Sequence, residues 1–78
     1  TDFTDANLHL ANFTNAYLRE ANLSGADLSD AVLTKANLKG ALLAGTNLKG
    51  AKMDDVKLDD AKFCKTVMPD GAVNDSGC

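Results

Sequence analysis

A large apolar residue recurs at every fifth position along almost the whole chain. The series is Phe3, Leu8, Phe13, Leu18, Leu23, Leu28, Leu33, Leu38, Leu43, Leu48, Met53, Leu58, Phe63 and Met68. Nearly every member follows a small residue by two positions, namely Ala6, Ala11, Ala16, Ala21, Ala26, Ala31, Ala36, Ala41, Thr46, Ala51, Val56, Ala61 or Thr66. A repeat this regular constrains the fold more than any other feature, because it requires equivalent units that stack on one another.

A period of five fits neither a regular helix nor a regular strand. In an α-helix five residues advance by about 500°, so the series would spiral around the helix without forming a stripe. In a continuous strand the odd spacing would place successive members on opposite faces. Within one repeat, however, the small and the large residue point the same way on a short extended segment. If the chain turns one corner per repeat, all of these residues face a common axis, as in a solenoid.

Several repeats share one composition. Residues 21–25 read Ala-Asn-Leu-Ser-Gly, residues 26–30 read Ala-Asp-Leu-Ser-Asp, and residues 36–40 read Ala-Asn-Leu-Lys-Gly. Such units resemble the repeats of the pentapeptide-repeat family, and the resemblance runs from residue 1 to about residue 68. It implies an all-β fold, namely a right-handed quadrilateral parallel β-helix with about 20 residues per coil. We therefore expect about three and a half coils over residues 1–68 and a capping tail over residues 69–78.

The fold places the fivefold series in the core and the polar residues outside. Leu28, Leu33 and Leu38 belong to the middle coil and are expected to be the most buried. Glycines that close repeats are expected at corners with positive φ. The Asn and Asp residues that precede the leucines are expected to point outward at the corners and to bond the backbone.

Charge and residue types argue against most chemical functions. The net charge is −3, and both signs are mixed along the chain, so no basic patch favours direct binding of nucleic acid or of anionic lipid. No apolar run approaches membrane-spanning length. His9 is the single histidine, and we expect no catalytic, cofactor or metal site around it. The acidic pairs at residues 54–55 and 59–60 alternate with lysines and are expected to be a solvated surface.

The sequence therefore favours a non-enzymatic scaffold or protein–protein interaction module, whose partner is another protein. The family resemblance offers an alternative, since some members are DNA-mimicking inhibitors or protectors of a type II topoisomerase such as DNA gyrase. Those members resemble long acidic rods, whereas this chain is short and carries mixed charge.

Both ends of the solenoid need a cover. At the N-terminal end, Phe3 and Leu8 lie in an open coil with unpaired strand edges, which invite pairing. We expect either further repeats before Thr1 or end-to-end self-association of two molecules there. At the C-terminal end, Pro69-Asp70-Gly71 predicts a turn. The tail is expected to fold back over the last coil, with Ala72 and Val73 as apolar cover.

The two cysteines of the chain, Cys64 and Cys78, invite two interpretations. A disulfide between them would staple the tail over the last coil, and a loop of this length is worth about 3 kcal/mol. The alternative is a pair of unrelated thiols in a reducing cytoplasm. The string Thr66-Val67-Met68-Pro69-Asp70-Gly71, with Ser76-Gly77-Cys78 after it, resembles the endings of pentapeptide-repeat proteins from cyanobacteria and from the chloroplast thylakoid lumen. That resemblance, together with the disulfide, implies a thylakoid lumen or periplasm, whereas two free thiols would imply the cytoplasm.

Overall fold

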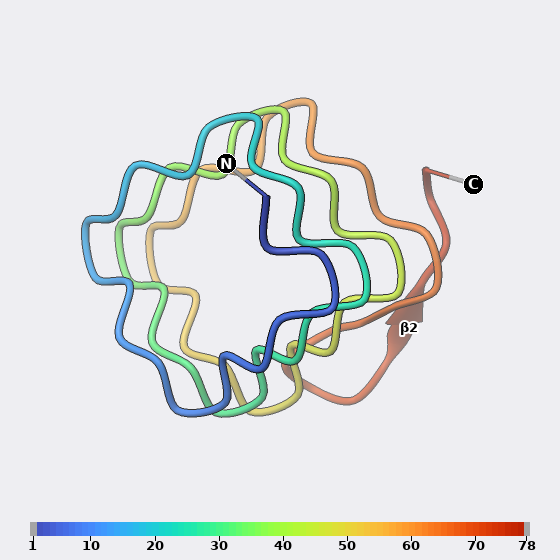
Figure 1. Ribbon diagram of the computed structural model, residues 1–78, viewed down its shortest axis with the longest axis horizontal. Helices are drawn as coiled ribbons and strands as arrows, with labels where there is room; N and C mark the ends of the chain where they lie inside the picture. Colours follow the sequence, from blue (N-terminus) through green and yellow to red (C-terminus); the bar gives the residue numbers. More distant parts are fainter. Residues whose placement is uncertain (1, 78) are drawn as a thin grey trace.

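A computed structural model describes residues 2–77 of the chain. Its regular strands are β1, Thr66–Val67, and β2, Val73–Asn74, and the described residues contain no helix. The remainder consists of short extended segments separated by turns, and the molecule measures 27 × 21 × 21 Å. Successive coils lie over one another as four-sided rings, which Figure 1 shows nearly end-on.

The pairing between coils fixes the length of one coil. Parallel bridges join residues that are 20 apart, beginning with Asp2 and Asn22 and ending with Asn47 and Val67. The same spacing holds on all four sides of the ring. The expected right-handed quadrilateral parallel β-helix is thereby confirmed.

Backbone hydrogen bonds between coils replace those of a conventional sheet. The N–H of Phe3 donates to the carbonyl of Asn22 at 2.7 Å, and the N–H of Asp27 donates to the carbonyl of Ala6 at 2.9 Å. This pattern repeats around the ring, so each inner coil is bonded to the coil on either side. The chain thus satisfies its backbone groups without any long strand.

Every repeat turns its corner with one residue in the left-handed region. The glycines at residues 25, 40, 45 and 50 have φ between 69° and 74°. The other repeats do the same without glycine, from Lys65 at 53° to Leu10 at 66°. The sequence identified only the glycine corners, because an ordinary side chain in this region costs about 1–2 kcal/mol. The inter-coil bonds hold the corner against this cost, since the N–H of Leu10 donates to the carbonyl of Ser29.

The Asn side chains that precede the leucines bond the backbone as expected, but from the sides of the ring and not from its corners. They occupy the bridging positions, as Asn22 and Asn37 do. The Oδ1 of Asn22 accepts the N–H of Ser24, two residues further on, at 3.1 Å. Asn37 accepts the N–H of Lys39 in the same way. Each of these side chains therefore holds the following turn from the preceding side.

The core is a narrow column of leucine and alanine along the axis. The leucines of the fivefold series from Leu18 to Leu48 are buried, and Leu28, Leu33 and Leu38 are fully so. The remaining members pack against this column and are only partly buried, namely Phe3, Leu8, Phe13, Met53, Leu58, Phe63 and Met68. Burial is therefore complete in the middle coils and incomplete at both ends, where a coil has a neighbour on one side only.

The first coil partly closes its own end. The rings of Phe3 and Phe13 come from opposite sides of the coil and meet edge to face, with ring centroids 6.1 Å apart. Such a contact contributes about 0.5–1.5 kcal/mol beyond the area that it buries. The sequence placed no cap at this end and missed this contact, because period alone does not show that two rings can span the axis.

Two threonines replace alanine in the core without leaving a polar group unpaired. Thr46 and Thr66 are fully buried. The Oγ1 of Thr46 donates to the carbonyl of Leu23 at 2.6 Å, and that of Thr66 donates to the carbonyl of Leu43. A buried hydroxyl is tolerated only with such a partner.

The C-terminal tail folds back as expected, but it does not supply the expected apolar cover. β2 pairs antiparallel with β1, with Thr66 opposite Asn74 and Val67 opposite Val73. Because Thr66 points into the core, alternation turns Val67 and Val73 outward. Ala72 is exposed and Val73 is 60% exposed. The prediction that these two residues cover the apolar layer was therefore wrong, and the tail instead pairs with the backbone edge of the last coil.

Candidate functional site

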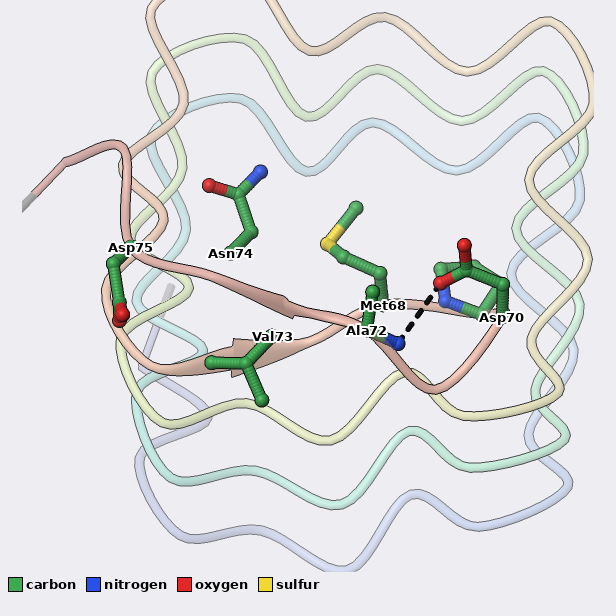
Figure 2. A pocket seen from close by; sticks show the side chains of 7 residues that line it. Met68, Asp70, Ala72, Val73, Asn74 and Asp75 are labelled. Carbon is green, nitrogen blue, oxygen red and sulfur yellow. Dashed lines mark hydrogen bonds between the residues drawn. The ribbon is translucent and has the colours of Figure 1, made fainter.

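The C-terminal hairpin carries the best-formed hollow on the described surface. The hollow has a volume of about 540 Å³ and is lined by Met68, Pro69, Asp70, Ala72, Val73, Asn74 and Asp75. Figure 2 shows Met68 and Asn74 on one side of the hairpin and Val73 on the other. The hollow therefore reaches both faces of the hairpin, and Met68, which packs against the core, belongs to its lining.

Local chemistry forces the chain to reverse at this point. The N–H of Gly71 donates to the carbonyl of Met68 at 2.8 Å, and the N–H of Met68 donates to the carbonyl of Ala72 at 2.7 Å. The Oδ1 of Asp70 accepts the N–H of Ala72 at 3.0 Å, as Figure 2 shows. Gly71 has a φ of 89°, which favours glycine. The turn predicted from Pro69-Asp70-Gly71 is confirmed, with these bonds as its cause.

Two further contacts fasten the tail to the last coil. The Oδ1 of Asp75 accepts the N–H of Lys65 at 2.8 Å. The N–H of Gly77 donates to the carbonyl of Phe63 at 2.6 Å. A Cβ at residue 77 would lie 2.9 Å from both the N and the O of Phe63, so this approach requires glycine. The repeat pattern could not predict this approach, because Gly77 stands outside the repeats.

The outer edge of β2 is unpaired within the described residues. Both backbone groups of Val67 bond to the third coil, since its N–H donates to Thr46 O and its carbonyl accepts Leu48 N. Val67 and Val73 are therefore a non-hydrogen-bonded pair of the antiparallel ladder. It follows that the N–H and the carbonyl of Val73 point away from β1.

The structure gives one half of the predicted cysteine pair. Cys64 lies half-buried beside the tail and is in a disulfide-bonded state. Cys78 lies outside the described residues, so its bond to Cys64 stays a prediction.

A polar cluster joins His9, Ser29 and Asp27 on one side of the ring. The Ser29 hydroxyl donates to Asp27 Oδ1 at 2.6 Å, and His9 Nδ1 lies 2.8 Å from Ser29 Oγ and 2.9 Å from Ser29 O. Although the three residue types are those of a catalytic triad, the connections differ. The hydroxyl proton is held by the carboxylate, and the carbonyl of Ser29 requires a donor from Nδ1. The imidazole is thus a donor to the serine and not its base.

The hydroxyl and N–H of Ser29, which both donate to the carboxylate, hold the pKa of Asp27 below its usual range. The hydroxyl and N–H of Thr4 lower the pKa of Asp2 in the same way. Both carboxylates stay charged because hydrogen bonds favour the ionised form. Both are local turn contacts, at exposed positions for Asp2 and at half-buried positions for Asp27.

The other candidate groups do not converge. Among residues 2–77, no group of three or more His, Cys, Asp or Glu side chains could hold a metal ion. No helix in that range could cross a bilayer. The exposed large apolar side chains are Leu10, Tyr17, Leu42 and Val73. Leu10, Tyr17 and Leu42 belong to three different sides of the ring. Of the four, only Val73 adjoins the hollow.

The repeats match a known family over most of the chain. Residues 1–34 and residues 31–68 each match the family of pentapeptide repeats, which is defined by eight consecutive copies of the repeat. No curated protein aligns with the chain at a significant level.

Several solved structures are similar to this one, among them three pentapeptide repeat proteins. One is HetL, a pentapeptide repeat protein involved in heterocyst differentiation regulation from the cyanobacterium Nostoc sp. strain PCC 7120. It is 37% identical to this chain, with a TM-score of 0.65, and the match covers 94% of this chain and 36% of HetL. A pentapeptide repeat protein from the cyanobacterium Cyanothece 51142 is 35% identical, with a TM-score of 0.83 over 86% of this chain and 46% of that one.

The third is a pentapeptide repeat protein from the thylakoid lumen of Arabidopsis thaliana. It is 32% identical, with a TM-score of 0.84 over 95% of this chain and 52% of that one. The chain thus spans between about a third and a half of the length of these three proteins.

Proposed function

Because the chain belongs to the pentapeptide-repeat family, we propose that it is a non-enzymatic scaffold that binds another protein through its outer surface. One observation carries the proposal: leucine and alanine pack the axis of the solenoid, where Leu28, Leu33 and Leu38 are fully buried. A solenoid filled in this way recognises partners with the outside of its coils or with its ends.

The polar surface supports a binding role over a catalytic one. The triad-like cluster at His9 has the wrong donor order for a nucleophile. The backbone, in contrast, is held rigidly by bonds between coils, so outward side chains keep fixed spacings from one coil to the next. A regular lattice of this kind suits recognition of an extended or flat partner surface.

The experiment compares retention of proteins by the immobilised folded chain and by a Leu28→Asp variant, which buries a charge and cannot keep the core. A scaffold retains a defined partner in the first case and loses it in the second. Retention that is equal for both would overturn the proposal. A DNA gyrase supercoiling assay tests the topoisomerase alternative, for which the mixed surface charge gives no support. We expect no inhibition, and inhibition at stoichiometric protein would replace the scaffold role.

End-to-end association is a second mode of binding that we propose for the first coil. Phe3, Leu8 and Phe13 are only partly buried there. Unpaired strand edges beside half-buried apolar side chains favour stacking on another coil, either of further repeats or of a second molecule. Sedimentation that stays monomeric at all concentrations, for a natural chain with no repeat before Thr1, would contradict it.

We also propose that the protein works in a thylakoid lumen or periplasm. Two observations support this, namely the disulfide-bonded state of Cys64 and the similarity to a thylakoid-lumen protein. Disulfides persist in oxidising compartments. The test is alkylation of the unfolded, unreduced protein from its native compartment, followed by mass measurement. No labelled thiol is expected. Two labelled thiols would remove both the Cys64–Cys78 bond and the case for this location.

A further inference from the structure

We propose that the free edge of β2 is a docking site for an extended peptide segment of another protein, which carries an apolar residue flanked by basic residues. The proposal rests on the scaffold function above and names its surface and its partner. It follows from the backbone geometry of the hairpin, from the side chains around the hollow and from their charge.

The backbone of Val73 provides the pairing groups. Its N–H and carbonyl point away from β1, because both groups of its partner Val67 are used by the third coil. In an antiparallel ladder this arrangement alternates, so Val73 would exchange two hydrogen bonds with one residue of an added strand. Strand addition of this kind takes its affinity from the main chain and its specificity from alternate side chains.

The edge also continues an existing ladder. On this side of the solenoid, bridges connect Asn7 to Asp27 and Asp27 to Asn47, and a further bridge connects Asn47 to Val67. Val67 then pairs with Val73. An added strand would be the next member of this sheet, on a backbone that the inner coils already hold in place.

Side chains around the edge define what the central residue of the peptide must be. Val73 is 60% exposed on the outer face, beside the outward Val67. The central residue of the added strand lies next to Val73 on that face, so an apolar, β-branched residue fits. Its two neighbours point to the other face, toward Met68 and Asn74, which line the hollow.

The charge of the hollow selects the flanking residues and argues against a second copy of this chain. Asp70 and Asp75 stand at the two ends of the lining, and no cation is among the lining residues. The peptide residue two positions before its centre and the one two positions after it lie opposite residues 75 and 71. Both are within reach of these carboxylates. Lysine or arginine fits there, whereas two β2 edges would bring four carboxylates together. The expected pattern is basic–x–apolar–x–basic.

The test is a titration of the isotope-labelled 78-residue protein, followed by amide NMR. The probe is the blocked peptide Lys-Thr-Val-Thr-Lys. The matched controls are the same peptide with an N-methyl group on its central valine and the peptide Glu-Thr-Val-Thr-Glu. The N-methyl group removes one main-chain donor while the protein stays unchanged. The protein variant Val73→Pro removes the free N–H from the other side, and proline is tolerated where a strand edge faces solvent.

We expect saturable amide shifts confined to residues 71–77 with the first peptide. Both control peptides and Val73→Pro should weaken binding at least tenfold, while the amide of Thr66 on β1 keeps its chemical shift in the Val73→Pro variant. Shifts elsewhere, or equal binding by the N-methyl peptide, would overturn the docking site. Concentration-dependent shifts at Val73 without peptide would overturn the chosen occupant in favour of a second copy. If the Val73→Pro variant still retains a partner that the unchanged folded protein retains, the docking site is wrong but the scaffold function is not contradicted.

Discussion

The middle coils and the C-terminal hairpin are held by different forces, although they belong to one ladder. In the middle coils each leucine is enclosed by the coil below and the coil above, and Leu28 has no exposed surface. In the hairpin, Val73 is largely exposed, and the contacts that fix the tail are hydrogen bonds of residues 68–77. The comparison indicates that burial sets the stability of the solenoid, whereas backbone pairing sets the position of its C-terminal edge.

Truncation of a leucine should have the largest effect, and its cost should differ between the middle coils and the end coil. Leu28→Ala should cost about 2–5 kcal/mol in the free energy of unfolding, because the coils on both sides prevent collapse around the cavity. Leu58→Ala, at a partly buried site of the open end, should cost about 1–2 kcal/mol. Urea unfolding measures both. Equal losses would mean that the end coil is packed as tightly as the middle.

The buried threonines sharpen the account of the core. Thr46→Val keeps the volume but removes the hydroxyl that donates to Leu23 O. That carbonyl still accepts the N–H of Ala26, so the loss should be about 1 kcal/mol. Thr34→Val, on the half-buried outer side, is the matched control and should change stability by less than about 0.5 kcal/mol. A stabilised Thr46→Val protein would show that the core prefers a purely apolar column.

Gly77 tests whether the tail is fixed by close backbone approach. Gly77→Ala places a Cβ 2.9 Å from the backbone of Phe63 and should release residues 75–77, with a change of global stability below about 1 kcal/mol. Gly71→Ala is the control, since its Cβ meets nothing within 4 Å and only its φ of 89° is unfavourable. Protection of the amide at position 77 and of the Lys65 amide should fall in the first variant and persist in the second. The reverse order would place the constraint in the turn.

The smallest expected effect is the pH dependence of the Asp27 turn. The lowered pKa of Asp27 means that the folded state favours the carboxylate. Its contribution is therefore present above the unfolded pKa of about 3.9 and is lost as the pH falls through the lower folded value. Asp27→Asn keeps an acceptor, as in Asn22 and Asn37, but removes the titration. Between pH 6 and pH 2.5 the melting temperature should fall slightly less in the variant, and an identical fall would contradict the assignment.

The repeat predicted the solenoid well because each of its units reports the same constraint. A period of five excludes helix and strand, and the resemblance of the units to a known family supplies the coil length. What could not be predicted depends on contacts between non-equivalent residues. The ring contact of Phe3 with Phe13 and the approach of Gly77 to Phe63 each occur once. The outward turn of Val73 follows from the register of one hairpin, and an apolar residue in a tail does not reveal which way it points.

Native-state hydrogen exchange tests most directly whether the solenoid and its hairpin are separable. The N–H groups of Leu28, Leu33 and Leu38 bond to carbonyls of the next coil and should exchange only on global unfolding. The N–H groups of Met68 and Gly77 should exchange through local opening of the tail, with protection at least about 100-fold lower. Equal protection of the two sets, lost together in denaturant, would contradict the account and make coils and hairpin one cooperative unit.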